Sequence, residues 1–410
     1  MPDKYLVMIS LDAVSSADLK HLEEMPNFKA LRREGTLVRD VQSVFISNTY
    51  PAHTSIITGT YPFRHGIQNN TYFTPGKYPE NWRWDSSKIR VPALWEEVLK
   101  QGMRVCSILY PVTGKSKITY NFPEFAGKMN PLKRVWKTIR NGTPSYMLSI
   151  LFRLPFYLMK IKHIRLDDLT TAIAADTIKK HCPELLLLHL IETDEIKHQK
   201  GPDSSTVIKS LEEQDKRIGL LVRTLQDAGI YDETGIIIFS DHGCLPVHTQ
   251  VDANIFLQEK NLIQYKGKKL LRYDAYFYSA GGTAFLRVFN REKAGEIEKM
   301  IMQMKDKPYF SRFLTSDEMK SSGMDSDFQY GIEAAEGYSF SKGDPHGQHG
   351  YGLQREDYYP FYFAKGSLIP VNQTDSGGSI IDICPLAAEM LGIPKWPMDG
   401  QSRRTNWISS

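Results

Sequence analysis

The chain has 410 residues, which is long enough for one large α/β domain with insertions or for two domains. Its hydrophobic content of 41% and charged content of 24% are those of an ordinary globular protein. A net charge of +4 is too small to indicate a nucleic-acid partner, so we expect no binding to a nucleic-acid duplex. The cysteines lack the paired spacing of a disulfide framework or a Cys-based metal site; they are Cys106, Cys182, Cys244 and Cys384.

The N-terminal stretch MPDKYLVMISLDA contains an apolar run that is too short for a signal peptide. No apolar run in the chain approaches the roughly 18 residues of a membrane-spanning helix. From these two observations we expect a cytoplasmic protein without a transmembrane segment.

Apolar strand-like runs alternate with amphipathic helical patterns along the chain. Strands are predicted over 5–12, 104–110, 184–191, 235–241 and 359–365, and helices over 18–34, 51–58, 92–102, 167–181 and 205–228. Near-continuous apolar strands are typical of a sheet that is buried on both faces. The pattern therefore predicts an α/β fold with a mainly parallel central sheet and helices on both of its faces.

Two regions depart from this alternation, and we interpret both as insertions in a single domain over 1–410. Residues 120–165 look like a helical insertion, whereas 250–345 combine a strand, TAFLRVF, with a helix, REKAGEIEKMIMQMKD, as in a small α+β subdomain. The stretch 134–165 is both basic and apolar. It is either a helix packed on the main domain, which we favour, or an element that lies on a membrane surface or acts as a lid.

Acidic and histidine residues follow directly after several of the predicted strands, at the strand ends where parallel α/β sheets bind ligands. They are Asp12, Asp194, His198, Asp241 and His242, with His349 in the Gly-rich stretch HGQHGYG. Taken singly, a strand-end Asp is often a turn former and a lone His is often a packing residue. Taken together, three carboxylates and three imidazoles suit two divalent metal ions, and the mixture favours zinc or a similar transition metal.

The stretch NTYPAHTSIITG reads as a short helix that begins near Thr49 and ends at Gly59. Thr49 could be only a helix cap. Alternatively, its hydroxyl lies at a helix N-terminus, which binds phosphate oxygens, and a metal ion there would make the alkoxide accessible.

With these residues collected, the chain resembles the alkaline phosphatase superfamily, and within it the type I phosphodiesterase/nucleotide pyrophosphatase family. The family pattern around its nucleophile appears here as TYPAHTSIITGTYPFRHGIQNN (49–70). The motif ISLDA precedes this stretch, and TDEIKH, SDHG and GQHGY come after it, in the order that the family has. The match covers 1–110, 184–245 and 345–402.

The resemblance implies a role for each matching residue. One metal ion would be held by Asp194, His198 and His349, and the other by Asp12, Asp241 and His242, with Thr49 as the nucleophile. Asn70 would donate to a phosphate oxygen, with Asn69 as the fallback if the loop register differs by one. Tyr50 next to the nucleophile is expected to contact the substrate or, equally, to pack in the core. His53 and His65 are assigned to packing.

The chain departs from the family pattern at Ala52, at Lys197 and at Tyr50, where the family has Asn, Gly and Phe. None of these changes removes a proposed ligand or the nucleophile, although Lys197 beside a metal ligand puts the substrate preference in doubt.

The expected function is hydrolysis of a small phosphodiester, such as a nucleotide, through a covalent phospho-threonine intermediate at a dimetal centre. Alternatives are a phosphomonoesterase or phosphonate hydrolase on the same core, or a binding protein of this fold without activity. A sulfatase is disfavoured because His53 stands where that class needs arginine. The oligomeric state stays open.

Overall fold

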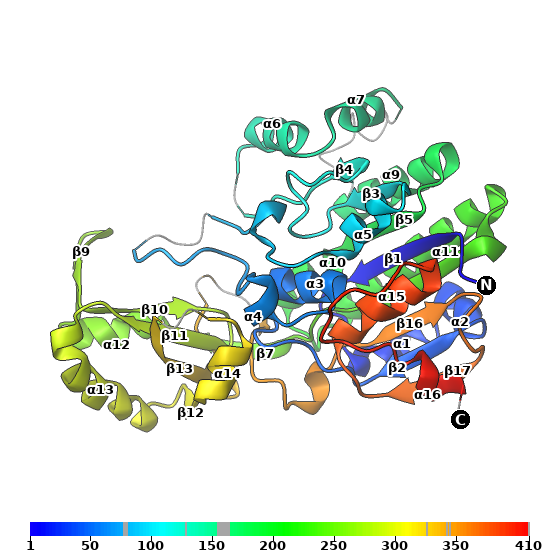
Figure 1. The fold of residues 1–410 in the computed structure, drawn as a ribbon. Coiled ribbons are helices and arrows are strands. Elements are labelled where there is room, and N and C mark those ends of the chain that lie inside the picture. Colours follow the sequence, from blue (N-terminus) through cyan, green and yellow to red (C-terminus); the bar gives the residue numbers. More distant parts are fainter. Residues whose placement is uncertain are drawn as a thin grey trace.

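A mixed sheet forms the centre of the molecule in the computed structural model (Figure 1). The structure describes all residues except 77–80, 128, 154–164, 325–326, 342, 344–345 and 409–410. Within the described part the sheet has eight strands, in the order β17 (Gln373–Ser376), β2 (Thr36–Arg39), β16 (Tyr362–Lys365), β6 (Thr234–Phe239), β1 (Tyr5–Leu11), β5 (Leu185–Leu190), β3 (Val105–Ile108) and β4 (Tyr120–Phe122). Its neighbouring strands pair in parallel except at β16, which runs antiparallel to both β2 and β6.

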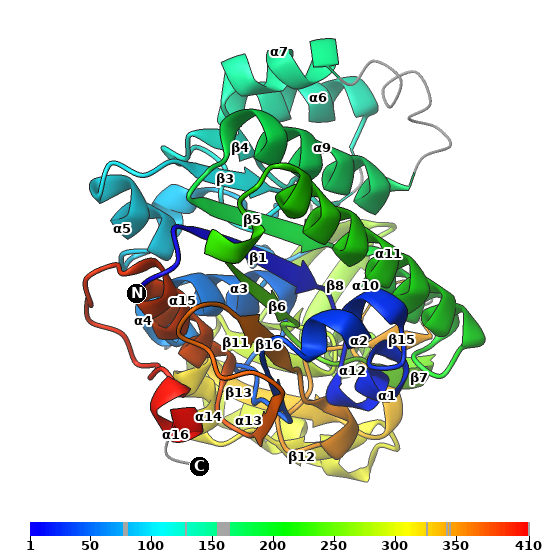
Figure 2. The same ribbon diagram turned by 90° about the vertical axis from the view of Figure 1, so that its right-hand side faces the viewer.

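Helices cover both faces of this sheet, as predicted (Figure 2). One face packs against α3 (Thr49–Thr58), α5 (Leu94–Lys100) and α15 (Ile383–Leu391). The other packs against α1 (Leu19–Leu22), α2 (Pro26–Arg32), α9 (Leu166–His181) and α11 (Ser205–Asp227). Strand β1 shows why its sequence is apolar throughout: Leu6 and Met8 enter the first core, whereas Val7 and Ile9 enter the second.

The predicted helix over 18–34 is two helices. Helix α1 ends at Leu22, and α2 begins at Pro26. Met25 has an extended backbone with ψ of 140°, because proline disfavours the helical conformation in the residue before it. Proline itself is well accommodated as the first residue of the new helix.

An antiparallel sheet dominates residues 253–334, at the left of Figure 1. Its strand order is β10 (Ala275–Ser279), β11 (Thr283–Val288), β13 (Phe328–Ala334) and β12 (Phe310–Phe313), with the hairpin β8 (Ile263–Lys266) and β9 (Lys269–Tyr273) beside it. Helices α12 (Ala253–Glu259) and α13 (Ala294–Met302) share its core, and α14 (Ser316–Ser321) follows β12. A second apolar cluster, which includes Phe45, Ile46 and Phe285, joins this region to the main sheet. The interpretation of residues 250–345 as a subdomain stays a prediction.

The expected helical insertion over 120–165 begins with strand β4 and continues with α6 (Pro131–Asn141) and α7 (Pro144–Arg153). Residues 154–164 of that stretch lie outside the described residues. The remaining helices are α4 (Pro62–His65), α10 (Glu192–Lys200) and α16 (Arg404–Ile408), and a small sheet joins β14 (Gly337–Ser339), β7 (Leu245–Gln250) and β15 (Gly347–Gln348).

The buried strands predict a test of the core. Leu187 lies in the middle of β5 with no exposed surface, so Leu187→Ala should lower the free energy of unfolding by about 2 to 5 kcal/mol. Urea unfolding measures the change, and Leu220→Ala on the exposed side of α11 is the matched control, with less than about 1 kcal/mol expected. Equal losses in the two variants would contradict the assigned core.

Candidate active site

Three aspartates meet at the edge where β1, β5 and β6 end. Asp12 directly follows β1, Asp241 follows β6 by two residues, and Asp194 lies in the first turn of α10, which begins two residues after β5. Because β1 pairs in parallel with both neighbours, all three strands end on the same side of the sheet. The sheet itself therefore brings these carboxylates together.

Two further elements add histidines to this group. On α10, His198 stands four residues after Asp194, and its Nε2 lies 3.4 Å from Asp194 Oδ2. His349 is far from the other ligands in sequence, and the pairing of β15 with β7 brings it to them. Gln348, its neighbour, lies opposite Leu245, and Leu245 is three residues after His242. The rings of His242 and His349 stack with their centroids 4.2 Å apart.

The structure forms two overlapping ligand groups from these residues. Asp194, His198 and His349 offer ligand atoms within 4.8 Å of one another, and so do Asp12, Asp194 and His242. Asp241 Oδ2 lies 3.1 Å from His242 Nε2. Asp194 therefore lies between the two groups, whereas the resemblance placed it only with the first.

The donor set fits divalent cations. The buried oxygens Asp12 Oδ1, Asp194 Oδ1 and Asp241 Oδ2 have no hydrogen-bond partner. Burial, and then the carboxylates of Asp241 and Asp194, raise the pKa of Asp12 well above its usual range. Burial alone would lower the pKa of His198, but Asp194 raises it to about 9. Both pKa shifts indicate that these buried carboxylates need compensating positive charge.

Each of the histidines His198, His242 and His349 is oriented by an oxygen that accepts a hydrogen bond from its Nδ1. Nδ1 donates to Gly347 O in His198 (2.7 Å), to Gly243 O in His242 (3.1 Å) and to Asn48 Oδ1 in His349 (2.6 Å). With the proton on Nδ1, the lone pair of each Nε2 points into the cluster, as is typical of metal-ligating histidines.

Thr49 is the first residue of α3, and Asn48 is its N-cap. Thr49 Oγ1 lies 3.4 Å from His242 Nε2, which puts the hydroxyl at the edge of the ligand cluster. The backbone N–H of Tyr50 donates to Asn70 Oδ1 at 2.8 Å. Because that bond fixes the carbonyl end of the Asn70 amide, its NH2 end is left to donate elsewhere.

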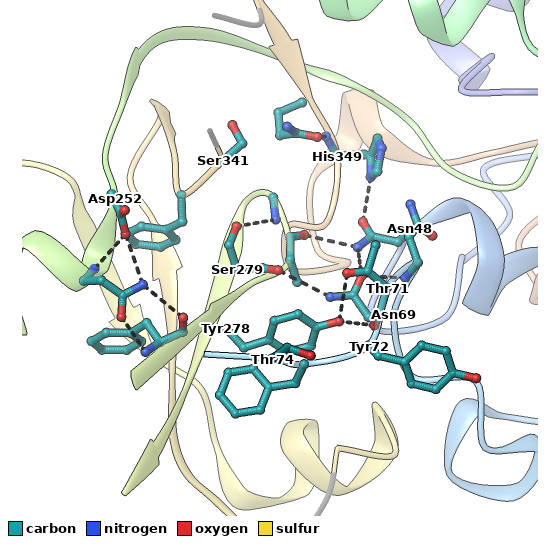
Figure 3. Close-up of a pocket in the computed structure, with 18 of the residues that line it drawn as sticks. Asn48, Asn69, Thr71, Tyr72, Thr74, Asp252, Tyr278, Ser279, Ser341 and His349 are labelled. Carbon is teal, nitrogen blue, oxygen red and sulfur yellow. Dashed lines mark hydrogen bonds between the residues drawn. The ribbon is translucent and has the colours of Figure 1, made fainter. Parts of the chain in front are cut away.

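Two cavities border this site. The threonine-side cavity, of about 460 Å3, is lined by Asp12, Thr49, Phe122, Phe125 and Arg134 among others. The histidine-side cavity, of about 310 Å3, is lined by Asn70, His198, Tyr278 and His349 among others (Figure 3). Trp82 borders both cavities.

Tyr50 borders the threonine-side cavity but exposes none of its surface, and its ring packs on Trp82 with centroids 5.2 Å apart. Burial, reinforced by Glu124, raises the pKa of Tyr50 well above its usual range, so the hydroxyl stays neutral. A contact of Tyr50 with substrate stays a prediction.

Sequence reasoning missed a group of buried residues behind the site. His53, assigned to packing, has Nδ1 3.3 Å from Asp241 Oδ2 and Nε2 2.7 Å from Ser10 Oγ. His189 Nε2 contacts Asp12 Oδ2 at 3.0 Å. The one histidine in the leucine run LLLLHL could have indicated this role, because a buried polar side chain needs a partner.

Asn48, also missed, connects the nucleophile helix to the ligands. Its Oδ1 accepts from His349, while its Nδ2 donates to Asn69 Oδ1 at 2.7 Å and to Ala280 O at 3.3 Å (Figure 3). Its position directly before the helix start is the pattern that could have indicated an N-cap.

Lys197 replaces the glycine of the family pattern, and its side chain is almost wholly buried. Its ammonium donates to Asp18 Oδ2 at 2.5 Å and to Ala13 O at 2.9 Å. Ala13 has a positive φ of 59°, and its N–H donates to Asp241 Oδ1 at 3.2 Å. Lys197 therefore braces the turn that carries Asp12, and its charge points away from the ligand cluster.

The sheet and the carboxylate and histidine residues at its edge define a member of the alkaline phosphatase superfamily. The model of the type I phosphodiesterase / nucleotide pyrophosphatase family matches residues 6–351, and the chain belongs to this family of phosphoric ester hydrolases. Members of the family depend on metal ions, and the two ligand groups give this chain the residues to bind them.

Known proteins agree with this assignment. The bis(5'-adenosyl)-triphosphatase ENPP4 of Bos taurus is 25% identical over 98% of this chain and 81% of its own length. Venom phosphodiesterase 2 of Crotalus adamanteus is 25% identical over 76% of this chain but only 35% of its own length. The structure of inactive murine ENPP5 in complex with AMP superposes with a TM-score of 0.72 over 98% of both chains, at 20% identity, which shows the shared fold.

The expectation of a cytoplasmic protein is wrong. The relatives are named as venom phosphodiesterases and ectonucleotide pyrophosphatases, which are enzymes that act outside cells. The short apolar stretch near the N-terminus was a poor guide to cellular location, because it forms the central strand β1 of the sheet. Among the described residues, no helix has the length and apolar character to cross a bilayer.

The contacts of Lys197 predict a structural role. Lys197→Met should lower the free energy of unfolding by about 3 kcal/mol, because it leaves the Asp18 carboxylate without its ammonium partner. Urea unfolding measures the loss. Lys200→Met, at an exposed position on the same helix, is the matched control and should change stability little. An unchanged stability in Lys197→Met would show that the buried ammonium braces nothing.

Proposed function

We propose that the chain hydrolyses phosphodiesters of the nucleotide type through a covalent phospho-threonine intermediate on Thr49, at a centre of two divalent metal ions. The observation that supports this most directly is the position of the Thr49 hydroxyl, which lies at a helix N-terminus and 3.4 Å from His242 Nε2. An inactive threonine-to-alanine variant of murine ENPP5 has been crystallised with AMP, which agrees with a threonine nucleophile.

Asp194, His198 and His349 would hold one ion, and Asp12, Asp241 and His242 the other; Asp194 belongs to both of the ligand groups that the side chains form. Mixed imidazole and carboxylate ligands favour zinc. When bound, such ions lower the pKa of a neighbouring hydroxyl and neutralise charge on the phosphoryl oxygens.

The residues of the chain then divide the chemistry between them. Thr49 Oγ1 attacks phosphorus and forms a bond to it while the bond from phosphorus to the first ester oxygen breaks, and that oxygen leaves with its organic group and with the proton of the threonine hydroxyl. The free NH2 group of Asn70 donates to a phosphoryl oxygen, where negative charge grows in the transition state. In a second step water attacks the phosphorus, the bond from threonine to phosphorus breaks, one proton of the water passes to Thr49 Oγ1, and a monoester is released.

The two cavities favour a diester over a monoester. A diester carries two organic substituents, and cavities lie on both the threonine side and the histidine side of the cluster. A monoesterase needs positive charge around the free phosphate oxygens, yet Arg134 is the one Lys or Arg among the described residues that line either cavity. The half-buried Trp82, shared by both cavities, offers an aromatic face to a nucleobase.

Removal of the nucleophile is the central test. Thr49→Ala should lower kcat by at least about a thousandfold, because no other group at this position can form the covalent intermediate. The assay uses bis-p-nitrophenyl phosphate. Thr49→Ser keeps a hydroxyl at the same place and should retain part of the activity.

Metal content provides the control for this pair of variants. Zinc bound per chain, measured by atomic emission, should be the same in Thr49→Ala as in the unmodified protein, because the carboxylates and imidazoles are untouched. Near-normal turnover in a metal-loaded Thr49→Ala protein would overturn the assignment of the nucleophile.

Substrate preference gives a separate test. The kcat/KM for bis-p-nitrophenyl phosphate should exceed that for p-nitrophenyl phosphate by about tenfold or more, because a cavity for the second substituent contributes binding in the transition state. Phosphonoacetate tests the phosphonate alternative in the same assay. A higher kcat/KM for the monoester would move the chain to the phosphomonoesterases without changing the proposed nucleophile.

A further inference from the structure

Helix α6 turns its apolar side away from the protein. Leu132, Val135 and Trp136 are 81%, 51% and 58% exposed. Their spacing of i, i+3 and i+4 places them in one stripe along the helix. In a globular protein such a stripe normally packs into the core, so its exposure calls for a partner.

The side of α6 that faces the protein carries mostly polar residues, and Ile139 packs against the apolar core that also contains α9 and α11. Thr138 and Asn141 are buried, and they lie about 140° to 160° around the helix from Trp136. The Lys137 ammonium lies 4.5 Å from the ring of Trp84 and 4.4 Å from that of Phe125. Polar and cation–π contacts and the packing of Ile139 thus hold the helix, while Leu132, Val135 and Trp136 stay exposed.

Arg134 adds to the polar contacts of α6 by donating to Gly127 O at 2.6 Å. It also lines the threonine-side cavity together with Thr138. The same helix therefore has one side at the active-site cavity and the other in solvent.

The charged side chains of α6 are of one sign. The helix contains four Lys or Arg and no Asp or Glu. Lys133 and Arg140 are exposed beside the stripe, and the Arg140 guanidinium lies 5.0 Å from the Trp136 ring. Helix α7 adds two more exposed apolar side chains, Leu148 and Phe152, at a spacing of i, i+4. A partner must accept apolar side chains and carry negative charge.

We propose that α6 binds the surface of an anionic phospholipid bilayer. The stripe of Leu132, Val135 and Trp136 enters the boundary between headgroups and acyl chains, and Lys133 and Arg140 contact the lipid phosphates. A bilayer meets both requirements at once, because apolar and anionic groups lie side by side at its surface. In Figures 1 and 2, α6 and α7 stand at one end of the molecule beyond β4, where a flat surface can approach.

Membrane contact through this face brings the threonine-side cavity next to the bilayer. The position of Arg134 and Thr138 on the same helix fixes that geometry. The membrane contact does not depend on the proposed chemistry, since it rests on the exposed side chains of α6 and α7.

Vesicle co-sedimentation of the full chain tests the proposal. The protein should sediment with vesicles of phosphatidylcholine mixed with phosphatidylglycerol at low salt, and much less with phosphatidylcholine alone or at high salt. Trp136→Ala should weaken the binding about tenfold. Lys133→Gln should weaken it about fivefold.

Matched variants away from α6 separate the helix from general surface effects. Val371 is an apolar residue that is 65% exposed, so Val371→Ser is the partner of Val135→Ser, and Lys209→Gln on α11 is the partner of Lys133→Gln. Only the α6 variants should lose vesicle binding, with thermal unfolding unchanged in all four.

Three results would overturn the proposal. One is the absence of sedimentation with phosphatidylglycerol vesicles at low salt, and another is an equal loss of binding in Val135→Ser and Val371→Ser. The third is a dimer, seen by analytical ultracentrifugation, that Val135→Ser dissociates, because a second copy of the chain would then cover the stripe.

Discussion

Repulsion among three carboxylates is the constraint on which the rest of this structure depends. Asp12, Asp194 and Asp241 are gathered by three adjacent strands, and each keeps one buried oxygen without a hydrogen-bond partner. Two like charges about 4 Å apart repel by about 4 kcal/mol at an effective dielectric constant near 20. Such a cluster persists only if positive charge is supplied, and the inward-facing Nε2 atoms of three histidines show that the surrounding chain is arranged to hold cations there.

The proposed nucleophile, Thr49, is held by the same framework of residues as the candidate metal ligands. Asn48 occupies the N-cap position of α3, and its side chain orients His349 and holds Asn69, so one amide links the helix of Thr49 to a candidate ligand 301 positions away in the sequence. Asn69 in turn accepts from the N–H of Asn70, whose own side chain accepts from Tyr50. A hydroxyl, an amide donor and a ligand therefore keep their spacing through a chain of short hydrogen bonds, which is the preorganisation that catalysis at charged phosphorus requires.

The central sheet and the candidate ligands at its edge could be predicted from the sequence, because β1, β5 and β6 are almost wholly apolar and polar residues just after them stand out. The roles of Thr49 and Asn70 depended on family resemblance, since a threonine at a helix start is locally indistinguishable from a cap. Three things were beyond local patterns. Short strands such as β2, β4 and β17 have little apolar periodicity. The position of Asp194 between the two ligand groups depends on how helices and a sheet meet. The buried residues His53 and His189 can be recognised only from their contacts with Asp241 and Asp12.

Lys197 shows how a charged residue next to a candidate metal ligand can be held away from the ligand cluster. A lysine one residue from His198 could have supplied the positive charge that a monoesterase places around free phosphate oxygens. Instead its ammonium is bound by Asp18 and by the carbonyl of Ala13, on the far side of the turn that carries Asp12. A buried charge held by two acceptors cannot swing into the cavity without depriving the Asp18 carboxylate of its ammonium partner, which would be unfavourable. The Lys197 ammonium therefore adds no positive charge to the walls of either cavity, where Trp82 and Arg134 lie.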